Sequence, residues 1–163
     1  RDTSDPKDLC SYRVLTIPPG YTGFRGSQRV QDIQAWIESL RRPEVFSALT
    51  GASASDAAYD LSSFLETLVA AGVPFAGLSL DLSKCFDRII PAQCVGAARA
   101  YGCPEPILRA YEGWLARTTY RNILPHGLGR PHSRPAAIPQ GCAMSMLLLM
   151  VLLLPWIDHI AAA

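Results

Sequence analysis

Residues 74–87 read Pro74-Phe-Ala-Gly-Leu-Ser-Leu-Asp-Leu-Ser-Lys-Cys-Phe-Asp87, an apolar run that leads directly into an acidic turn. The run is too short for a typical helix and is bounded by turn-forming residues, so the pattern predicts a buried strand that ends at Asp81. A carboxylate at the end of a buried strand is costly unless it is paired, hydrogen-bonded or bound to a metal. Asp81 is therefore a candidate Mg²⁺ ligand, and the alternative is an aspartate that caps the following turn.

A second signal lies further along the chain, where Ile138-Pro-Gln-Gly-Cys-Ala-Met-Ser145 opens an apolar segment that we expect to be a helix. Glycine lets a backbone approach a ligand closely, and a glutamine amide both donates and accepts hydrogen bonds. The start of a helix also favours anions. Gln140 and Gly141 are therefore candidate ligand contacts, with an ordinary proline–glycine turn as the alternative.

The rest of the chain alternates helical patterns with a few short strand patterns. Helical periodicity predicts helices over residues 27–40, 55–71, 91–101 and 105–116, and a last helix from Cys142. Short apolar or β-branched runs predict strands at residues 15–17, 118–124 and 136–138, with residues 126–135 as a hairpin tip. Together these elements indicate a helix-rich α+β fold with a small antiparallel sheet.

Two of the predicted helices carry an apolar stripe that we expect to be buried. In the first, the stripe consists of Val30, Ile33, Ile37 and Leu40. In the second, it consists of Ala58, Leu61, Leu65 and Leu68, and Ser55 is the expected N-cap.

Composition favours one folded core. Apolar residues make up 49% of the 163 residues and charged residues only 18%, which excludes a highly charged disordered chain. The net charge is only +1, but arginines gather in two stretches with few acids. The first holds Arg13, Arg25, Arg29, Arg41 and Arg42, and the second holds Arg117, Arg121, Arg130 and Arg134. Such stretches can neutralise phosphate groups, and an ordinary solvated surface is the alternative.

Several classes of protein are excluded. The five cysteines include no Cys-x-x-Cys pair, which argues against a disulfide framework or structural zinc and favours an intracellular compartment, nucleus or cytoplasm, over secretion. The apolar run Met144–Ile157 is shorter than the roughly 20 residues of a membrane span. Because Pro155 also interrupts it, we expect a buried helix and no membrane partner. No Gly-x-x-x-x-Gly-Lys-Ser/Thr sequence occurs, which argues against a P-loop.

The order of these motifs is similar to that in a known family. Asp-Leu-Ser-Lys-Cys-Phe-Asp at 81–87 and Pro-Gln-Gly-x-x-x-Ser at 139–145 resemble motifs A and B of reverse transcriptases. The resemblance is strongest to the branch of non-LTR retrotransposons and group II introns. Residues 51–57 are similar to the fingers motif of that family, and residues 12–17 resemble the start of its fingers. The resemblance therefore spans residues 12–157.

This resemblance implies a fold and an activity. The expected fold is a partial right-hand polymerase, with a fingers-like segment over residues 1–73 and an incomplete palm over residues 74–163. The expected activity of the intact enzyme is that of an RNA-directed DNA polymerase of a mobile element. Such an enzyme adds deoxynucleoside triphosphates to a DNA primer on an RNA template and uses two Mg²⁺ ions.

The resemblance also implies residue roles. Asp81 would be the catalytic Mg²⁺ ligand, assisted by the backbone carbonyl of Leu82. The ring of Phe86 would lie beneath the incoming sugar and exclude a 2′-hydroxyl, unless Phe86 is an ordinary core aromatic. Nucleotide contacts are implied for Gln140, Gly141 and Arg13, and structural roles are expected for Lys84 and Asp87. The candidate contacts to nucleic acid are Arg117, Arg121, Arg130 and Arg134, from the second arginine stretch.

The chain departs from the family in ways that bear on activity. Val14 stands where the family has proline, and Ala52 stands where it has a phosphate-binding arginine. No Phe/Tyr-x-Asp-Asp sequence occurs, so the second metal-binding carboxylate is missing and we expect the isolated chain to be inactive. We expect a fragment that stops before motif C and leaves open both an apolar face from Met146 to Leu154 and the edge of the strand at residues 74–81. Two alternatives are a non-catalytic nucleic-acid-binding relic and an unrelated small α+β scaffold.

Overall fold

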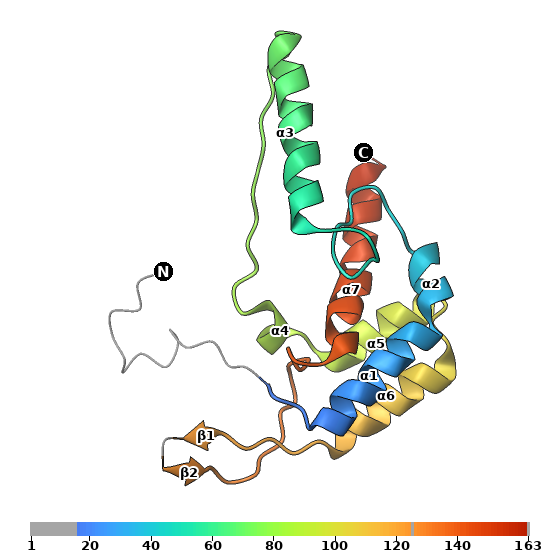
Figure 1. Cartoon of the computed structure of the whole chain (residues 1–163), viewed down its shortest axis with the longest axis vertical. Coiled ribbons are helices and arrows are strands. Elements are labelled where there is room, and N and C mark those ends of the chain that lie inside the picture. Colours follow the sequence, from blue (N-terminus) through green and yellow to red (C-terminus); the bar gives the residue numbers. More distant parts are fainter. Residues whose placement is uncertain (1–15, 125, 163) are drawn as a thin grey trace.

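The computed structural model of the protein describes residues 16–124 and 126–162, and Figure 1 shows their arrangement. Within these residues the chain forms helices joined by loops and one short hairpin. In chain order the elements are α1 (Gly20–Asp32), α2 (Gln34–Ser39), α3 (Ala54–Ala70), α4 (Cys85–Arg88), α5 (Pro91–Ala100), α6 (Glu105–Arg117), β1 (Ile123–Leu124), β2 (Gly127–Leu128) and α7 (Ala143–Ala161). The predicted helix-rich character is confirmed, and the strands are fewer and shorter than predicted.

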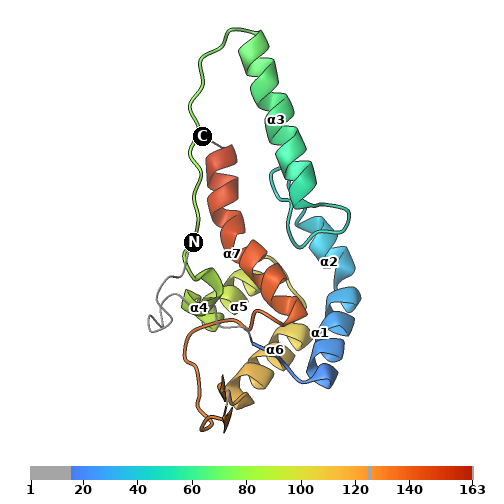
Figure 2. The ribbon, with the colours of Figure 1, turned by 60° about the vertical axis from the view of Figure 1, so that its left-hand side comes forward.

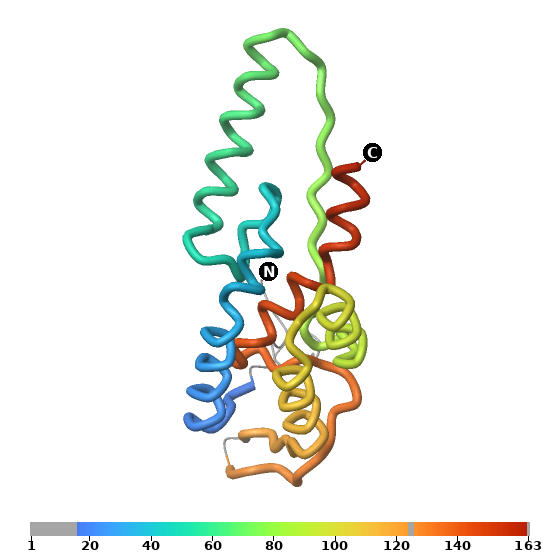
Figure 3. Tube along the Cα trace, turned by 90° about the vertical axis from the view of Figure 1, so that its right-hand side faces the viewer, coloured from blue at the N-terminus to red at the C-terminus, as the bar shows by residue number. Residues whose placement is uncertain are grey.

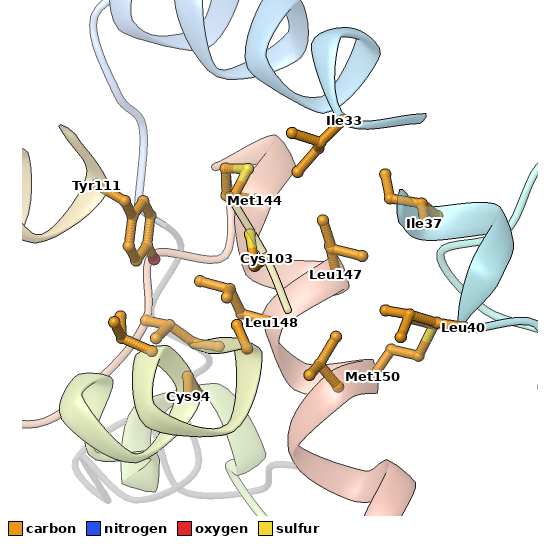
Figure 4. Close-up of a cluster of buried hydrophobic side chains, with 14 of the residues drawn as sticks. Ile33, Ile37, Leu40, Cys94, Cys103, Tyr111, Met144, Leu147, Leu148 and Met150 are labelled. Atoms are coloured by element: carbon orange, nitrogen blue, oxygen red, sulfur yellow. The ribbon is translucent and has the colours of Figure 1, made fainter. Parts of the chain in front are cut away.

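Helix α7 forms the centre of the core. From Met144 to Leu154 its sequence is Leu, Met and Val apart from Ser145, so it has apolar side chains on every side. It packs against α5 and against α1, while α6 packs on α5 (Figure 2). Figure 4 shows Leu147 facing α1 and α2, and Leu148 facing α5. Its buried residues are Met144, Ser145, Leu147, Leu148, Met150, Val151 and Leu154.

The helix predicted over residues 27–40 is in fact two helices. The first begins earlier, at Gly20, and Ile33 separates α1 from α2 with φ −109° and ψ 17°. The predicted start was wrong because packing against α7 outweighs the low helix propensity of the glycines in α1. Gly26 is buried at this contact, where an added Cβ would lie 3.9 Å from the Cβ of Ala143. The predicted stripe is confirmed as buried for Ile33, Ile37 and Leu40.

Helices α5 and α6 end within one residue of their predicted bounds. Their local signals are strong: Pro91 occupies the first turn of α5, and Gly102 takes φ +79° where the chain leaves that helix. Both helices direct an apolar face into the core. Their buried residues are Cys94, Val95 and Ala98 in α5, and Leu108 and Tyr111 in α6.

Helix α3 forms as predicted but packs differently. Its N-cap is Ser53 rather than Ser55, and the Ser53 hydroxyl accepts a hydrogen bond from the Asp56 N–H. No residue of α3 is buried, although its predicted core face carries Leu61. The expected burial of this stripe was therefore wrong. In Figures 1 and 3, α3 and the chain that follows it extend away from the helical core.

The strand predicted over residues 74–81 does not form. Residues 73–82 are extended chain without a partner strand among the described residues, and the side chains of Leu78 and Leu80 are 84% and 65% exposed. A strand is stable only when its N–H and C=O groups pair with a neighbour. The strand prediction was wrong for this reason, and the open strand edge expected at these residues does not form either.

The other predicted strands are also reduced. The hairpin β1–β2 pairs Ile123 with Leu128, and an isolated bridge pairs Tyr120 with His132. Residues 136–138 are not a strand of this hairpin, so that prediction was wrong, as was the strand at Thr16 and Ile17. The loop predicted over residues 126–135 instead contributes β2, Gly127–Leu128, and the bridge at His132.

One hydrophobic core joins the described residues of the two segments predicted over residues 1–73 and 74–163. The Trp36 indole N–H donates a 2.8 Å hydrogen bond to the Tyr101 carbonyl, and Arg42 Nε lies 2.9 Å from Asp158 Oδ1. Both contacts link the first segment to the second. The assignment of these segments to fingers and palm stays a prediction, and their helices fold together.

By length and composition alone, α7 could cross a membrane, since its 19 residues have a mean hydropathy of 1.9. In the folded chain 39% of its most apolar window is buried. Seven residues between Met144 and Leu154 are buried, so the predicted burial is confirmed for this part of the segment. The open apolar face expected from Met146 to Leu154 was wrong for most of its residues, because α1 and α5 cover them, although Met146 is exposed. The absence of a membrane partner stays a prediction.

Replacing a core residue of α7 tests this arrangement. We expect Leu148→Ala to lower the free energy of unfolding by about 2–5 kcal/mol, because Leu148 is 0% exposed and its loss leaves a cavity. The matched control Leu78→Ala should change it by less than about 0.5 kcal/mol, since that side chain is exposed. Urea unfolding followed by circular dichroism measures both values. Equal losses in the two variants would show that residues 73–82 are packed in solution.

The Arg42–Asp158 pair predicts a pH dependence of stability. The hydrogen bond from Arg42 lowers the pKa of Asp158, and Tyr101 Oη adds a 3.2 Å hydrogen bond. A carboxyl whose pKa is lower in the folded state stabilises above its unfolded pKa of about 3.9, and this contribution disappears as the pH falls through the folded pKa. Asp158→Asn should therefore be less stable than the parent near neutral pH, and thermal unfolding should show the difference vanish in acid. A difference that is constant with pH would contradict the assignment.

Candidate functional site

Asp81 lies at the end of the exposed extended segment, and its side chain is exposed to solvent. A tight turn follows, in which the Cys85 N–H donates a 3.2 Å hydrogen bond to the Leu82 carbonyl. Lys84 takes the left-handed conformation with φ 52° and precedes the single turn α4. The Leu82 carbonyl that was expected to bind metal thus already accepts one hydrogen bond.

The end of the acidic motif and the approach to the Pro-Gln-Gly turn lie side by side. The Ile138 N–H donates a 3.0 Å hydrogen bond to the Phe86 carbonyl, and the Ala137 N–H donates a 2.8 Å bond to the Ile89 carbonyl. Between these segments Arg134 Nη2 lies 2.9 Å from Asp87 Oδ1, and both side chains are partly buried. The structural role expected for Asp87 is consistent with this ion pair. These contacts connect two motifs that are far apart in the sequence.

Gly141 is required by the packing of the chain itself. A Cβ added there would collide with the Thr16 carbonyl oxygen and would lie 2.8 Å from Pro18 Cδ. The segment at residues 16–18 therefore crosses directly over the turn, at a distance that only glycine permits. Gln140 is half-buried, and Phe86 is half-buried against the hydrophobic core. The roles of Gln140, Gly141 and Phe86 in nucleotide binding stay predictions.

Asp81 is exposed and Gln140 is half-buried. Neither residue lines the two cavities characterised below. Within residues 16–124 and 126–162, no group of three or more histidine, cysteine or acidic side chains is placed to hold a metal ion. Asp87, the nearest acid in the motif, is occupied by Arg134. Of the two carboxylates in the acidic motif, Asp81 alone is exposed and outside an ion pair among the described residues.

A cavity of about 420 Å³ lies between α1, α6 and the start of α7. Three of its lining residues are arginines: Arg25 and Arg29, one turn apart on α1, and Arg117, at the end of α6. Burial raises the pKa of the Cys142 thiol at this site, and the nearby positive charge of Arg29 opposes that rise. The thiol is therefore neutral at physiological pH, and the charge of the cavity is positive.

A larger cavity of about 830 Å³ adjoins the first and shares three residues with it, Thr22, Trp114 and Thr118. Its further lining includes aromatic and hydrogen-bonding side chains. Tyr120 lies beneath the guanidinium of Arg134, whose Cζ is 5.5 Å from the ring centroid. Asn122, His132 and Arg121 complete the polar side of this groove.

The arginines predicted to contact nucleic acid differ in whether they line one of the two cavities. Arg117 and Arg121 line the two cavities, whereas Arg130 is exposed and lines neither. Arg134 lines the larger cavity but is held by Asp87 and Tyr120. Arg13 lies outside the described residues.

Sequence reasoning did not associate Arg25 and Arg29 with Arg117, because they belong to a different arginine stretch. Arg25 also precedes the predicted helix start at residue 27, so its i, i+4 relation to Arg29 on one helix face became clear only with α1 beginning at Gly20. Nothing in the sequence places that face beside the end of α6. The position of Trp114 at the boundary of the two cavities could not be predicted for the same reason.

Substitution of Gly141 tests the close crossing of residues 16–18. We expect Gly141→Ala to lower the free energy of unfolding by about 1–3 kcal/mol, because backbone atoms must move to admit the methyl group. Gly96→Ala is the matched control: it lies inside α5 with open space around it, so it should be neutral or stabilising by up to about 1 kcal/mol. Thermal unfolding of both variants measures the two changes in stability. A neutral Gly141→Ala would mean that the crossing does not persist in solution.

Comparisons with known proteins identify no relative of this chain. No family model matches it, and neither a curated protein nor a solved structure matches it. Function is therefore inferred from the geometry and chemistry of its own residues.

Proposed function

We propose that the chain is a fragment of an RNA-directed DNA polymerase of a mobile element, containing fingers and an incomplete palm. One observation carries the proposal: the acidic motif and the Pro-Gln-Gly turn, distant in sequence, are joined by backbone hydrogen bonds from Ile138 to Phe86 and from Ala137 to Ile89. An active site built from motifs A and B requires these two segments to be neighbours. An unrelated scaffold in which the motifs are coincidental has no such requirement.

In this proposal the residues of the acidic motif and of the Pro-Gln-Gly turn bind a deoxynucleoside triphosphate and its metal ion. Mg²⁺ supplies the positive charge that neutralises the transferring phosphoryl group. Asp81 would hold that ion through its carboxylate, together with the Leu82 carbonyl. The ring of Phe86 supports the sugar and excludes a 2′-hydroxyl, and Gln140 contacts the sugar or base across the Pro-Gln-Gly turn.

Two features limit what the isolated chain can do. The sequence contains no Phe/Tyr-x-Asp-Asp, so a second carboxylate for a two-ion clamp is missing. Asp81 also lies on extended chain that has no partner strand among the described residues, and a catalytic ligand needs rigid support to be effective. We therefore propose that this chain binds a metal and nucleotide weakly and does not extend an RNA-templated DNA primer.

A second candidate is a non-catalytic nucleic-acid-binding module. The observation that favours it is the meeting of Arg25, Arg29 and Arg117 in one cavity. Phosphate binding by arginine needs neither a metal nor an ordered Asp81. The two candidates differ in whether Asp81 participates.

Paramagnetic Mn²⁺, which replaces Mg²⁺ at oxygen ligands, distinguishes them. In the presence of a deoxynucleoside triphosphate, Mn²⁺ should broaden the amide NMR signals of residues 81–86 and 140–141. Asp81→Asn should weaken this Mn²⁺ binding at least about tenfold, because it removes the charged ligand.

Asp60→Asn is the matched control, since Asp60 is an exposed aspartate of α3. It should leave the broadening unchanged. Broadening that ignores Asp81→Asn, or that spreads equally to the signals around Asp60, would contradict the polymerase proposal and leave the binding module.

A further inference from the structure

The cavity between α1, α6 and the start of α7 concentrates positive charge. Figures 2 and 3 show these three helices side by side. The arginines that line the cavity are Arg25, Arg29 and Arg117, and no acidic residue within 16–124 and 126–162 lines it. The first turn of α7 lines it through Met144 and adds the partial positive charge of a helix N-terminus.

These three arginines differ from others in the protein. Arg41, Arg42, Arg99, Arg109 and Arg134 each lie within salt-bridge distance of a carboxylate. Among the described residues, no carboxylate lies at that distance from Arg25, Arg29 or Arg117. Like charges gathered in a concave site repel one another and attract an anion. A guanidinium fork matches the oxygens of a phosphate group, which makes phosphate the anion that three arginines fit best.

The adjoining groove indicates which phosphate compound fits. Trp114 lines both cavities, so an aromatic ring lies at the boundary between the arginines and the groove. Beyond it, Asn122 and His132 supply hydrogen-bonding groups and Tyr120 a second aromatic ring. Nucleic acids combine a phosphate with a flat base that stacks on aromatic side chains. A lipid headgroup or a free phosphate ion has no part that uses the aromatic groove.

A single strand suits this site better than a duplex. The site is hollow, and a base enters a hollow only after it leaves the stack of its neighbours. In a single strand that unstacking costs little, whereas a duplex must also break a base pair.

We propose that Arg25, Arg29 and Arg117 bind phosphate groups of a single-stranded nucleic acid, and that a base of the same strand lies in the adjoining groove against Trp114. This inference rests on the proposed function only in taking the ligand to be nucleic acid. It requires neither a metal nor Asp81, so the two can fail separately.

The experiment measures fluorescence anisotropy of a labelled single-stranded uridine or thymidine oligonucleotide, without divalent metal, from about 50 to about 200 mM salt. In Arg25→Gln/Arg29→Gln/Arg117→Gln the slope of log affinity against log salt should fall by about 2, since each phosphate contact to a single strand contributes about 0.7. Arg109→Gln is the matched control. It removes one charge from α6 at an exposed position and should change the slope by much less.

The base contact has its own readout. An abasic strand of the same length keeps the phosphates but lacks bases, and it should bind the parent protein at least about fivefold more weakly. Circular dichroism should show that the triple variant keeps its helical content, because Arg25 and Arg117 are exposed.

Three outcomes would overturn the inference. The triple variant binds the strand as tightly as the parent and Arg109→Gln do; the abasic strand binds as tightly as the intact one; or the three arginines mediate binding to phosphatidylserine vesicles or inorganic phosphate but not to the strand. None of these outcomes touches the Mn²⁺ test of Asp81. Conversely, if Asp81→Asn did not weaken Mn²⁺ binding, the result for binding of the single strand would still stand.

Discussion

Burial of α7 is the constraint on which the rest of the structure depends. A helix with Leu, Met and Val on all sides must be covered from several directions, and α1, α2 and α5 provide that cover. The same packing gives Gly26 its close approach to α7 and brings Arg25 and Arg29 beside α6. It also leaves the hydroxyls of Tyr111 and Ser145 buried without a hydrogen-bond partner among the described residues. Burial raises the pKa of Tyr111, so this hydroxyl stays neutral.

The acidic motif is divided between two environments. Its second half, from Cys85, is attached to the chain before the Pro-Gln-Gly turn by hydrogen bonds and by the Asp87–Arg134 ion pair. Its first half, including Asp81, belongs to exposed chain without a partner strand in the described part of the protein. Any function assigned to Asp81 thus requires order that the described residues do not supply. The arginine cavity, by contrast, is lined by three helices and by the residues that flank α6 and α7, Thr118 and Cys142.

The sequence predicted those elements whose signals are local. Pro91 and Gly102 mark the ends of α5, and the apolar run after Cys142 predicts α7, because both signals act within a few residues. The strand at residues 74–81 was predicted wrongly because a strand depends on a distant partner, which periodicity does not report. The candidate site shows the same limit. The motifs identified Asp81 and Gln140, but the reason for Gly141 lies in the crossing of residues 16–18, and the arginine cavity depends on how α1 meets α6.

The exposed chain at residues 73–82 has a consequence for how this protein responds to proteases. Extended, solvent-exposed chain enters a protease active site readily, whereas helices in a packed core do not. A single nick there would separate α1 and α2 from α5, α6 and α7 covalently, yet these helices share one hydrophobic core and the Arg42–Asp158 ion pair. The two pieces would consequently stay bound to each other, and the nicked protein would run as one species in gel filtration while giving two bands under denaturing conditions.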